Sequence, residues 1–173
     1  WLTGNLNIEH FKPDRARIKT FANGLKVGVL AIAEPSLFYD HFGLSIDNPK
    51  QTVLSQIASM REKEKPDLIV LLTHAERQTA LSYLDLKGID IIINGHIVNE
   101  SDVIDMKPVR KNGKIFVQSS PKGQKMGELR VHIEPDGQKS VKHAMVKLDS
   151  SVKFAPEMVE LYKEYNDKIE AIF

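Results

Sequence analysis

Two histidines, His74 and His96, follow apolar segments of the sequence at equivalent positions. His74 comes directly after DLIVLLT (67–73), and His96 follows IDIIING (89–95). In a parallel sheet the first residues past the carboxyl ends of the strands share one edge, and neighbouring strands lie about 4.8 Å apart. Two imidazoles from adjacent strands therefore make half of a metal site. The pattern alone leaves a second interpretation open, in which each histidine is a hydrogen-bonded loop residue.

Small or turn-capable residues precede both histidines. Thr73 and Gly95 would let the backbone come close to a bound group. Asp40 and His41 follow the first apolar run and would add ligands at the same edge, although a polar pair in a loop is more often solvated.

The remaining polar candidates are weaker. His132 and His143 fall within predicted strands and are expected to lie on a sheet face, and His10 is uninformative. The loop SSPKGQKMG (119–127) carries hydroxyls, lysines and glycines that could approach a phosphate, yet it matches neither a Walker motif nor GxGxxG. A tight connection between strands is its expected role.

The elements that must position the two histidines are predicted from the hydrophobic pattern. In chain order they are a strand at 24–33, a helix at 48–65, a strand at 67–72, a helix at 76–88 and a strand at 89–93. Asn48 and Pro49 are expected as the cap and the first residue of the longer helix. This order implies parallel neighbours joined by right-handed crossovers, so the first part of the chain is α/β.

The pattern changes after Gly113. The segments 114–119, 127–135 and 138–148 alternate between apolar and polar residues, which indicates antiparallel strands covered on one face. The last segment, 155–173, has the spacing of an amphipathic helix and needs a partner surface. Its apolar stripe consists of Met158, Tyr162, Tyr165, Ile169 and Ile172.

Composition narrows the function classes. The 173 residues include 24 Lys and Arg against 23 Asp and Glu, so a net charge of +1 gives no field that would recruit nucleic acid. No run approaches the roughly 20 apolar residues of a membrane span, and the first residues lack the pattern of a signal peptide. Without cysteine, any metal must bind His, Asp, Glu or Asn. The chain opens on Trp1 and stops at Phe173 inside a helical pattern, so we expect a segment of a longer protein.

Several motifs, taken in order, resemble one known family. They are GLKVGVLAIAEPS (24–36), PDLIVLLTHAE (66–76) and GIDIIINGHIV (88–98), with WLTGNLNIEHFKP (1–13) before them and FVQSSPKGQKMGELRV (116–131) after them. Together they resemble the later half of the metallophosphoesterase domain of 5'-nucleotidases, within the calcineurin-like superfamily. The resemblance covers most of the chain, and it depends on the order and spacing of the motifs rather than on any one of them.

The resemblance implies a fold and a chemistry. The fold is a β-sandwich flanked by helices, of which this chain supplies the C-terminal half: a βαβαβ unit, antiparallel strands and a terminal linker helix. The family uses two divalent metal ions, Mn²⁺, Zn²⁺ or similar, about 3.5 to 4 Å apart, to hydrolyse a phosphate ester or nucleotide. His74 and His96 would be ligands. The other ligand motifs precede the covered region, and Gly4-Asn5 is rejected as one of them because Leu6-Asn7 follows.

Val98 departs from the family pattern GHxH, which would place a second ligand there. Valine has no lone pair, so one metal is weakened or lost unless Asn99 or Glu100 replaces it. We therefore expect a hydrolase segment that is inactive alone, with one metal or none. The alternative is a degenerate fold that serves as a scaffold or interaction domain. A third interpretation, a generic Rossmann-like domain, is disfavoured because Glu34-Pro35 stands where a glycine-rich turn would be.

The expected organisation has two parts. Residues 1–150 form a partial metallophosphoesterase-like domain, and 151–173 form a helix or linker toward a further domain. The expected partners are the missing N-terminal half of the same domain, a C-terminal domain beyond the linker and, in an active protein, a phosphate ester or nucleotide. No nucleic acid and no membrane span are expected. The family suggests a periplasmic or extracellular location.

Overall fold

A six-stranded mixed sheet forms the centre of the computed structural model, which describes residues 2–35, 44–96, 107–120 and 123–170. Four neighbouring strands are parallel, and one antiparallel strand lies at each edge. In spatial order the strands are β2 (Ala16–Thr20), β3 (Lys26–Ala33), β5 (Leu68–His74), β6 (Ile91–Asn94), β8 (Lys114–Gln118) and β7 (Val109–Lys111). A separate two-stranded pair joins β1 (Leu6–Asn7) to β4 (Ser45–Ile46).

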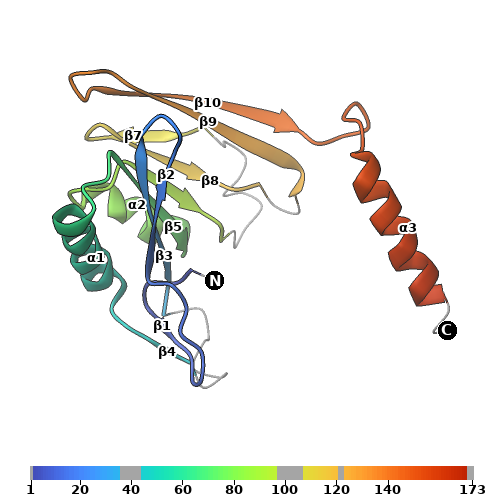
Figure 1. Ribbon diagram of the computed structural model, residues 1–173, viewed down its shortest axis with the longest axis horizontal. Helices are drawn as coiled ribbons and strands as arrows, with labels where there is room; N and C mark the ends of the chain where they lie inside the picture. Colours follow the sequence, from blue (N-terminus) through green and yellow to red (C-terminus); the bar gives the residue numbers. More distant parts are fainter. Residues whose placement is uncertain (1, 36–43, 97–106, 121–122, 171–173) are drawn as a thin grey trace.

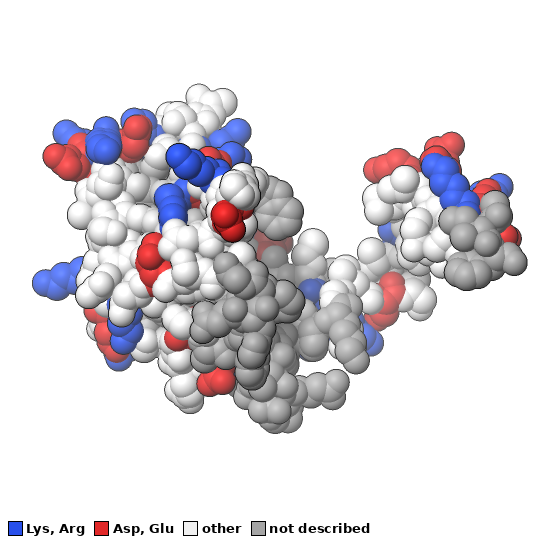
Figure 2. Space-filling view, turned by 90° about the horizontal axis from the view of Figure 1, so that it is seen from below, with Lys and Arg blue, Asp and Glu red and all other residues white. Residues whose placement is uncertain are grey.

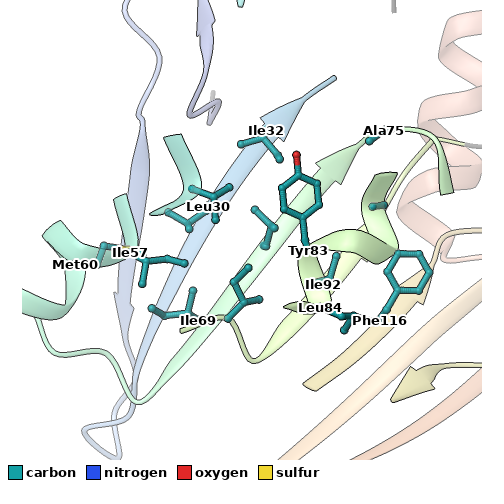
Figure 3. Close-up of a cluster of buried hydrophobic side chains, with 14 residues drawn as sticks. Leu30, Ile32, Ile57, Met60, Ile69, Ala75, Tyr83, Leu84, Ile92 and Phe116 are labelled. Atoms are coloured by element: carbon teal, nitrogen blue, oxygen red, sulfur yellow. The ribbon is translucent and has the colours of Figure 1, made fainter. Parts of the chain in front are cut away.

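Two helical segments cover one face of the sheet. Helix α1 (Pro49–Lys63) begins as predicted, with the Asn48 side chain accepting a hydrogen bond from the Gln51 amide at 3.1 Å. The second helix is shorter than predicted: α2 (Arg77–Ser82) tightens into the 3-10 turn η2 (Tyr83–Asp85). Both segments pack on the sheet through the apolar cluster drawn in Figure 3. Its largest fully buried members include Leu30, Ile69, Leu71, Tyr83, Leu84, Ile92 and Phe116.

A hairpin packs against the opposite face. Its strands, β9 (Lys125–Ile133) and β10 (Lys139–Lys147), are antiparallel, as the alternating pattern predicted. Leu129, Val131 and Val141 contact a second buried cluster, which consists of Leu68, Ile91, Ile115 and Val117. Figure 1 shows the hairpin extending past β7 and β8. The sheet therefore has apolar contacts on both faces.

Strand β8 differs from the prediction of an antiparallel strand covered on one face. It pairs in parallel with β6, with Ile92 opposite Phe116, and residues 115–118 are all buried. The reason is visible in the sequence IFV, which is a continuous apolar run typical of a parallel strand with two covered faces rather than an alternating one. The βαβαβ unit thus gains a fourth parallel strand.

The terminal helix α3 (Pro156–Glu170) lies away from the sheet (Figure 1). None of its described residues is buried, and its apolar stripe, including Met158, Tyr162 and Tyr165, is exposed. Ile172 lies outside the described residues. No helix in the described ranges has the length and apolar character needed to cross a bilayer. On the face shown in Figure 2, described basic and acidic side chains are interspersed, in accord with the small net charge.

Candidate metal centre

The structure brings the two predicted histidines together. His74 is the last residue of β5 and His96 follows β6 by two residues, and these strands are parallel neighbours with Thr73 opposite Asn94. The Nε2 atom of His74 lies 3.1 Å from Nδ1 of His96. The ring centroids are 4.7 Å apart at an interplanar angle of 69°. Two side chains 22 positions apart in sequence therefore meet at one edge of the sheet.

The environment of His74 favours its neutral form. The His74 side chain is exposed, but the atoms around it partly desolvate the ring, and this lowers its pKa below the ordinary value. Proximity to His96 lowers the pKa further. A neutral imidazole has the free lone pair that metal coordination requires.

The spacing of the two nitrogens can be compared with that in a metal site. Two imidazole nitrogens bound to one tetrahedral zinc ion, each at about 2.0–2.1 Å, lie about 3.3 Å apart. The observed 3.1 Å fits that separation, and it equally fits a hydrogen bond from one ring to the other. Within the part of the chain that the structure describes, no three His, Asp or Glu side chains form a group that could hold a metal. The pair thus fits as part of a ligand set, and ligation by it stays a prediction.

A buried amide holds the strand ends behind the histidines. Asn94 is fully buried, and its Oδ1 accepts hydrogen bonds from Thr73 Oγ1 at 2.8 Å and from the Ala75 amide at 3.3 Å. Its Nδ2 donates to the Ala75 carbonyl at 2.9 Å. The residues on either side of His74 are therefore both bound to one side chain.

Gln118 at the end of β8 extends this network to His96. Its Oε1 accepts from Asn94 Nδ2 at 3.1 Å, and its Nε2 donates to the His96 carbonyl at 2.7 Å. Neither Asn94 nor Gln118 was predicted from the sequence as part of the site. The sequence does show that Thr73, Asn94 and Gln118 are polar residues at the ends of apolar segments. The strand register then places them in one row across the sheet.

The other predicted candidates do not join the histidine pair. Asp40, His41, Val98, Asn99 and Glu100 lie outside the described residues. His132 is exposed on β9, and His143 is half-buried on β10. His143, Ser119 and Lys125 line a cavity of about 310 Å³ between the hairpin and the sheet.

The side-chain amide of Asn5 binds backbone groups on both sides of the loop that it joins. Its side chain is fully buried, with Oδ1 accepting from the Ala33 amide at 2.9 Å and Nδ2 donating to the Ala33 carbonyl at 2.8 Å. Nδ2 also reaches the Asp47 carbonyl at 3.2 Å. The amide therefore ties the end of β3 to the segment before α1.

No family model matches the chain. A 5'-nucleotidase of Vibrio vulnificus (strain CMCP6) is 26% identical over 197 aligned positions, which cover 84% of this chain and 35% of the relative. The resemblance to the 5'-nucleotidase family is thereby confirmed. The aligned region is about a third of that relative's length.

Two solved structures share the 5'-nucleotidase-like fold. A putative 5'-nucleotidase from Staphylococcus aureus, in complex with alpha-ketoglutarate, has a TM-score of 0.70 and 16% identity over 96% of this chain and 36% of its own. The sulfate thiohydrolase SoxB of Thermus thermophilus, in complex with glycerol, has a TM-score of 0.73 and 20% identity over 95% and 31%. These likenesses confirm the α/β fold class. The chain spans about a third of each relative.

Proposed function

We propose that this chain is the later part of the metallophosphoesterase domain of a 5'-nucleotidase-like phosphohydrolase, and that His74 and His96 bind one divalent metal ion. The observation that carries the proposal is the 3.1 Å separation of His74 Nε2 and His96 Nδ1 at the carboxyl edge of the parallel sheet. This edge is where open α/β sheets bind ligands. The family resemblance supplies the substrate class, a phosphate ester of the nucleotide type.

The residues of this chain would hold the ion rather than react. His74 Nε2 and His96 Nδ1 face each other at a separation suited to one ion, and the lowered pKa of His74 keeps that ring ready to coordinate. A divalent ion bound there would neutralise charge on the oxygens of a phosphate ester as it is hydrolysed. Mn²⁺ and Zn²⁺ are the candidates, since imidazole suits zinc and the family resemblance allows manganese.

A strip of half-buried apolar residues on the second sheet face supports a missing half of the same domain. Ala31, Leu72 and Ile93 stand opposite one another on three neighbouring strands, and all three are half-buried. Val29 and Val70 are half-buried in the next row, whose further members Ile91 and Ile115 are buried. We infer that the complementary half of the β-sandwich packs on this strip and brings the remaining ligands, so that the chain alone is inactive.

The proposed organisation follows from the same resemblance. Residues 1–150 would form the partial metallophosphoesterase domain, and 151–173 would connect it to a further domain. The exposed apolar stripe of α3 is consistent with a helix whose contacts lie elsewhere. A periplasmic or extracellular location rests on the family alone.

The test is metal-dependent phosphate release by the complete protein. With Mn²⁺ or Zn²⁺ and a generic aryl phosphate, we expect activity that His74→Ala and His96→Ala each abolish. His132→Ala is the matched control, because His132 is an exposed histidine on β9 that does not belong to the pair. Full metal-dependent activity in both variants of the pair would remove these residues from the mechanism.

A second candidate function is favoured by one observation in the sequence. Val98 stands where the family pattern places a ligand, so the chain would belong to a catalytically degenerate fold used as a scaffold or interaction domain. Elemental analysis of the complete, folded protein decides between the two. Absence of bound metal after exposure to Mn²⁺ and Zn²⁺, together with no phosphatase activity, favours the scaffold.

A further inference from the structure

The side chain of Asn94 makes hydrogen bonds to the two residues that flank His74 in the sequence. It accepts from the Thr73 hydroxyl at 2.8 Å, and it both accepts from and donates to the backbone of Ala75, at 3.3 Å and 2.9 Å. Thr73, Ala75 and Asn94 are all buried. A direct backbone hydrogen bond from Gly95 to the Thr73 carbonyl, at 2.8 Å, joins the same two strand ends. The backbone that carries the His74 ring therefore has little freedom to move relative to β6.

Gln118 makes a corresponding hydrogen bond to the backbone of His96. It donates to the His96 carbonyl at 2.7 Å and accepts from Asn94 at 3.1 Å, so the two amides form one chain of hydrogen bonds from His96 to the residues around His74. Gln118 is itself buried. The chain runs across three parallel strands, β5, β6 and β8, along one row of the register.

The arrangement does more than satisfy buried polar groups. An apolar residue at position 94 would fit the rest of β6, in which Ile91 and Ile92 are buried in the core. The Asn94 amide instead makes hydrogen bonds to the residues that flank His74. Through Gln118 it is also connected to the backbone of His96. Hydrogen-bonded groups behind a metal ligand fix its orientation, and here they act through the backbone that carries each ring.

We propose that Asn94 and Gln118 are positioning residues that fix the relative direction of the His74 and His96 rings. The part of this proposal that concerns metal affinity rests on the proposed function above. The part that concerns the contact between the rings does not, because it is argued from the 3.1 Å contact of the two ring nitrogens itself.

The test compares two variants of β6 in the metal-free protein. Asn94→Asp keeps the shape of the side chain and its acceptor oxygen, but as a carboxylate, at a pH that ionises it, it cannot donate to the Ala75 carbonyl or to Gln118. Ile92→Ala is the control, since Ile92 lies two residues earlier on the same face of the same strand and is fully buried. It weakens packing and leaves the amide network intact. The readout is the NOE between the two imidazole rings, with ¹⁵N shifts of histidine-labelled protein reporting the tautomers.

We expect Asn94→Asp to lose the NOE between the rings and to change the tautomer populations, while Ile92→Ala retains both. An NOE that persists in Asn94→Asp overturns the proposal, and so does its loss in both variants, because the contact would then follow stability alone. If Asn94→Asp does not fold, Gln118→Met decides instead. It removes the shorter of two hydrogen bonds to the His96 carbonyl, at 2.7 Å, and leaves the one from Asn94 at 3.4 Å, so unchanged His96 ring signals in that variant would contradict a positioning role for Gln118.

Zinc affinity of the complete protein separates this proposal from the proposed function. Loss of a group that orients a ligand typically weakens metal binding by about 10- to 100-fold, and we expect that loss for Asn94→Asp relative to Ile92→Ala. Equal affinities in the two variants count against positioning. If the unmodified protein binds no zinc, the proposed function is wrong. The NOE comparison between the variants would still test whether Asn94 and Gln118 position the two rings.

Discussion

The Nε2 atom of His74 lies 3.1 Å from Nδ1 of His96 at the edge of the sheet where β5 and β6 end. The first consequence concerns stability. Because His74 is exposed, His74→Ala should change the free energy of unfolding of the metal-free protein by less than about 1 kcal/mol. Urea denaturation measures this change. A cost of several kcal/mol would show that the histidine is kept for folding rather than for ligand binding.

Gly95 provides a test of whether a small residue is needed beside the pair. Its φ lies outside the left-handed range, and a Cβ there would approach the Thr73 carbonyl and His74 Nδ1 no closer than 3.8 Å and 3.9 Å. Gly95→Ala should therefore leave the stability unchanged or raise it by about 0.4–1 kcal/mol. If the same variant weakens metal binding, the glycine serves the approach of a ligand.

Gly88 is the control for that measurement. Its φ is +89°, and a Cβ there would lie 2.7 Å from a methyl group of Ile57. Gly88→Ala should destabilise the protein by about 1 kcal/mol or more, because both the backbone and the packing oppose a side chain. Similar losses for Gly95→Ala and Gly88→Ala in thermal unfolding would contradict the interpretation of Gly95.

The ion pair between Lys139 and Asp90 should hold the hairpin on the sheet. Its N–O distance is 2.6 Å, the side chains are 25% and 20% exposed, and Asp90 also accepts from the Ile69 amide at 2.7 Å. Lys139→Met leaves a partly buried carboxylate without its cation and should cost about 1–2 kcal/mol. Hydrogen exchange of the β9 and β10 amides should accelerate in parallel.

The matched control for the hairpin is Lys142→Met, which changes an exposed lysine on the same strand. Its effect should stay within about 0.5 kcal/mol. Equal destabilisation by the two variants would mean that Lys139 acts through general charge or strand propensity and not through Asp90.

Glu34 should make stability depend on pH. Burial, and then the nearby Glu76 carboxylate, raise its pKa above the ordinary value, against a smaller opposing effect of Lys50. The folded state thus holds this proton more tightly than the unfolded chain does, so this contribution to stability is present at low pH and is lost as pH rises through the raised pKa. Glu34→Gln should therefore be more stable than the unmodified protein at pH 7.

The advantage of Glu34→Gln should shrink as pH falls toward the ordinary glutamate value of about 4.3. Thermal unfolding between pH 4 and pH 7 follows the two curves together, with Glu62→Gln as the control for an exposed glutamate on α1. A constant difference across this range would show that titration of Glu34 is not its cause.

Local sequence was sufficient for the elements that position the pair. The apolar runs of β3, β5 and β6, the Asn48 cap of α1 and the alternation of β9 and β10 follow from side-chain patterns within each segment. The positions of His74 and His96 just at or past strand ends follow in the same way. These features depend on neighbours along the chain, which a sequence displays directly.

Tertiary structure decided which segments meet. Whether β8 pairs with β6, and in which direction, depends on strand pairing between distant segments, so the run IFV predicted a strand but not its parallel partner. The same register places Thr73, Asn94 and Gln118 in one row and turns three isolated polar residues into a network behind the histidines. The sequence by itself therefore determined that two imidazoles stand at strand ends, and only the pairing of β5, β6 and β8 decided that they touch and what holds them, because hydrogen bonding across a sheet is set by register rather than by local pattern.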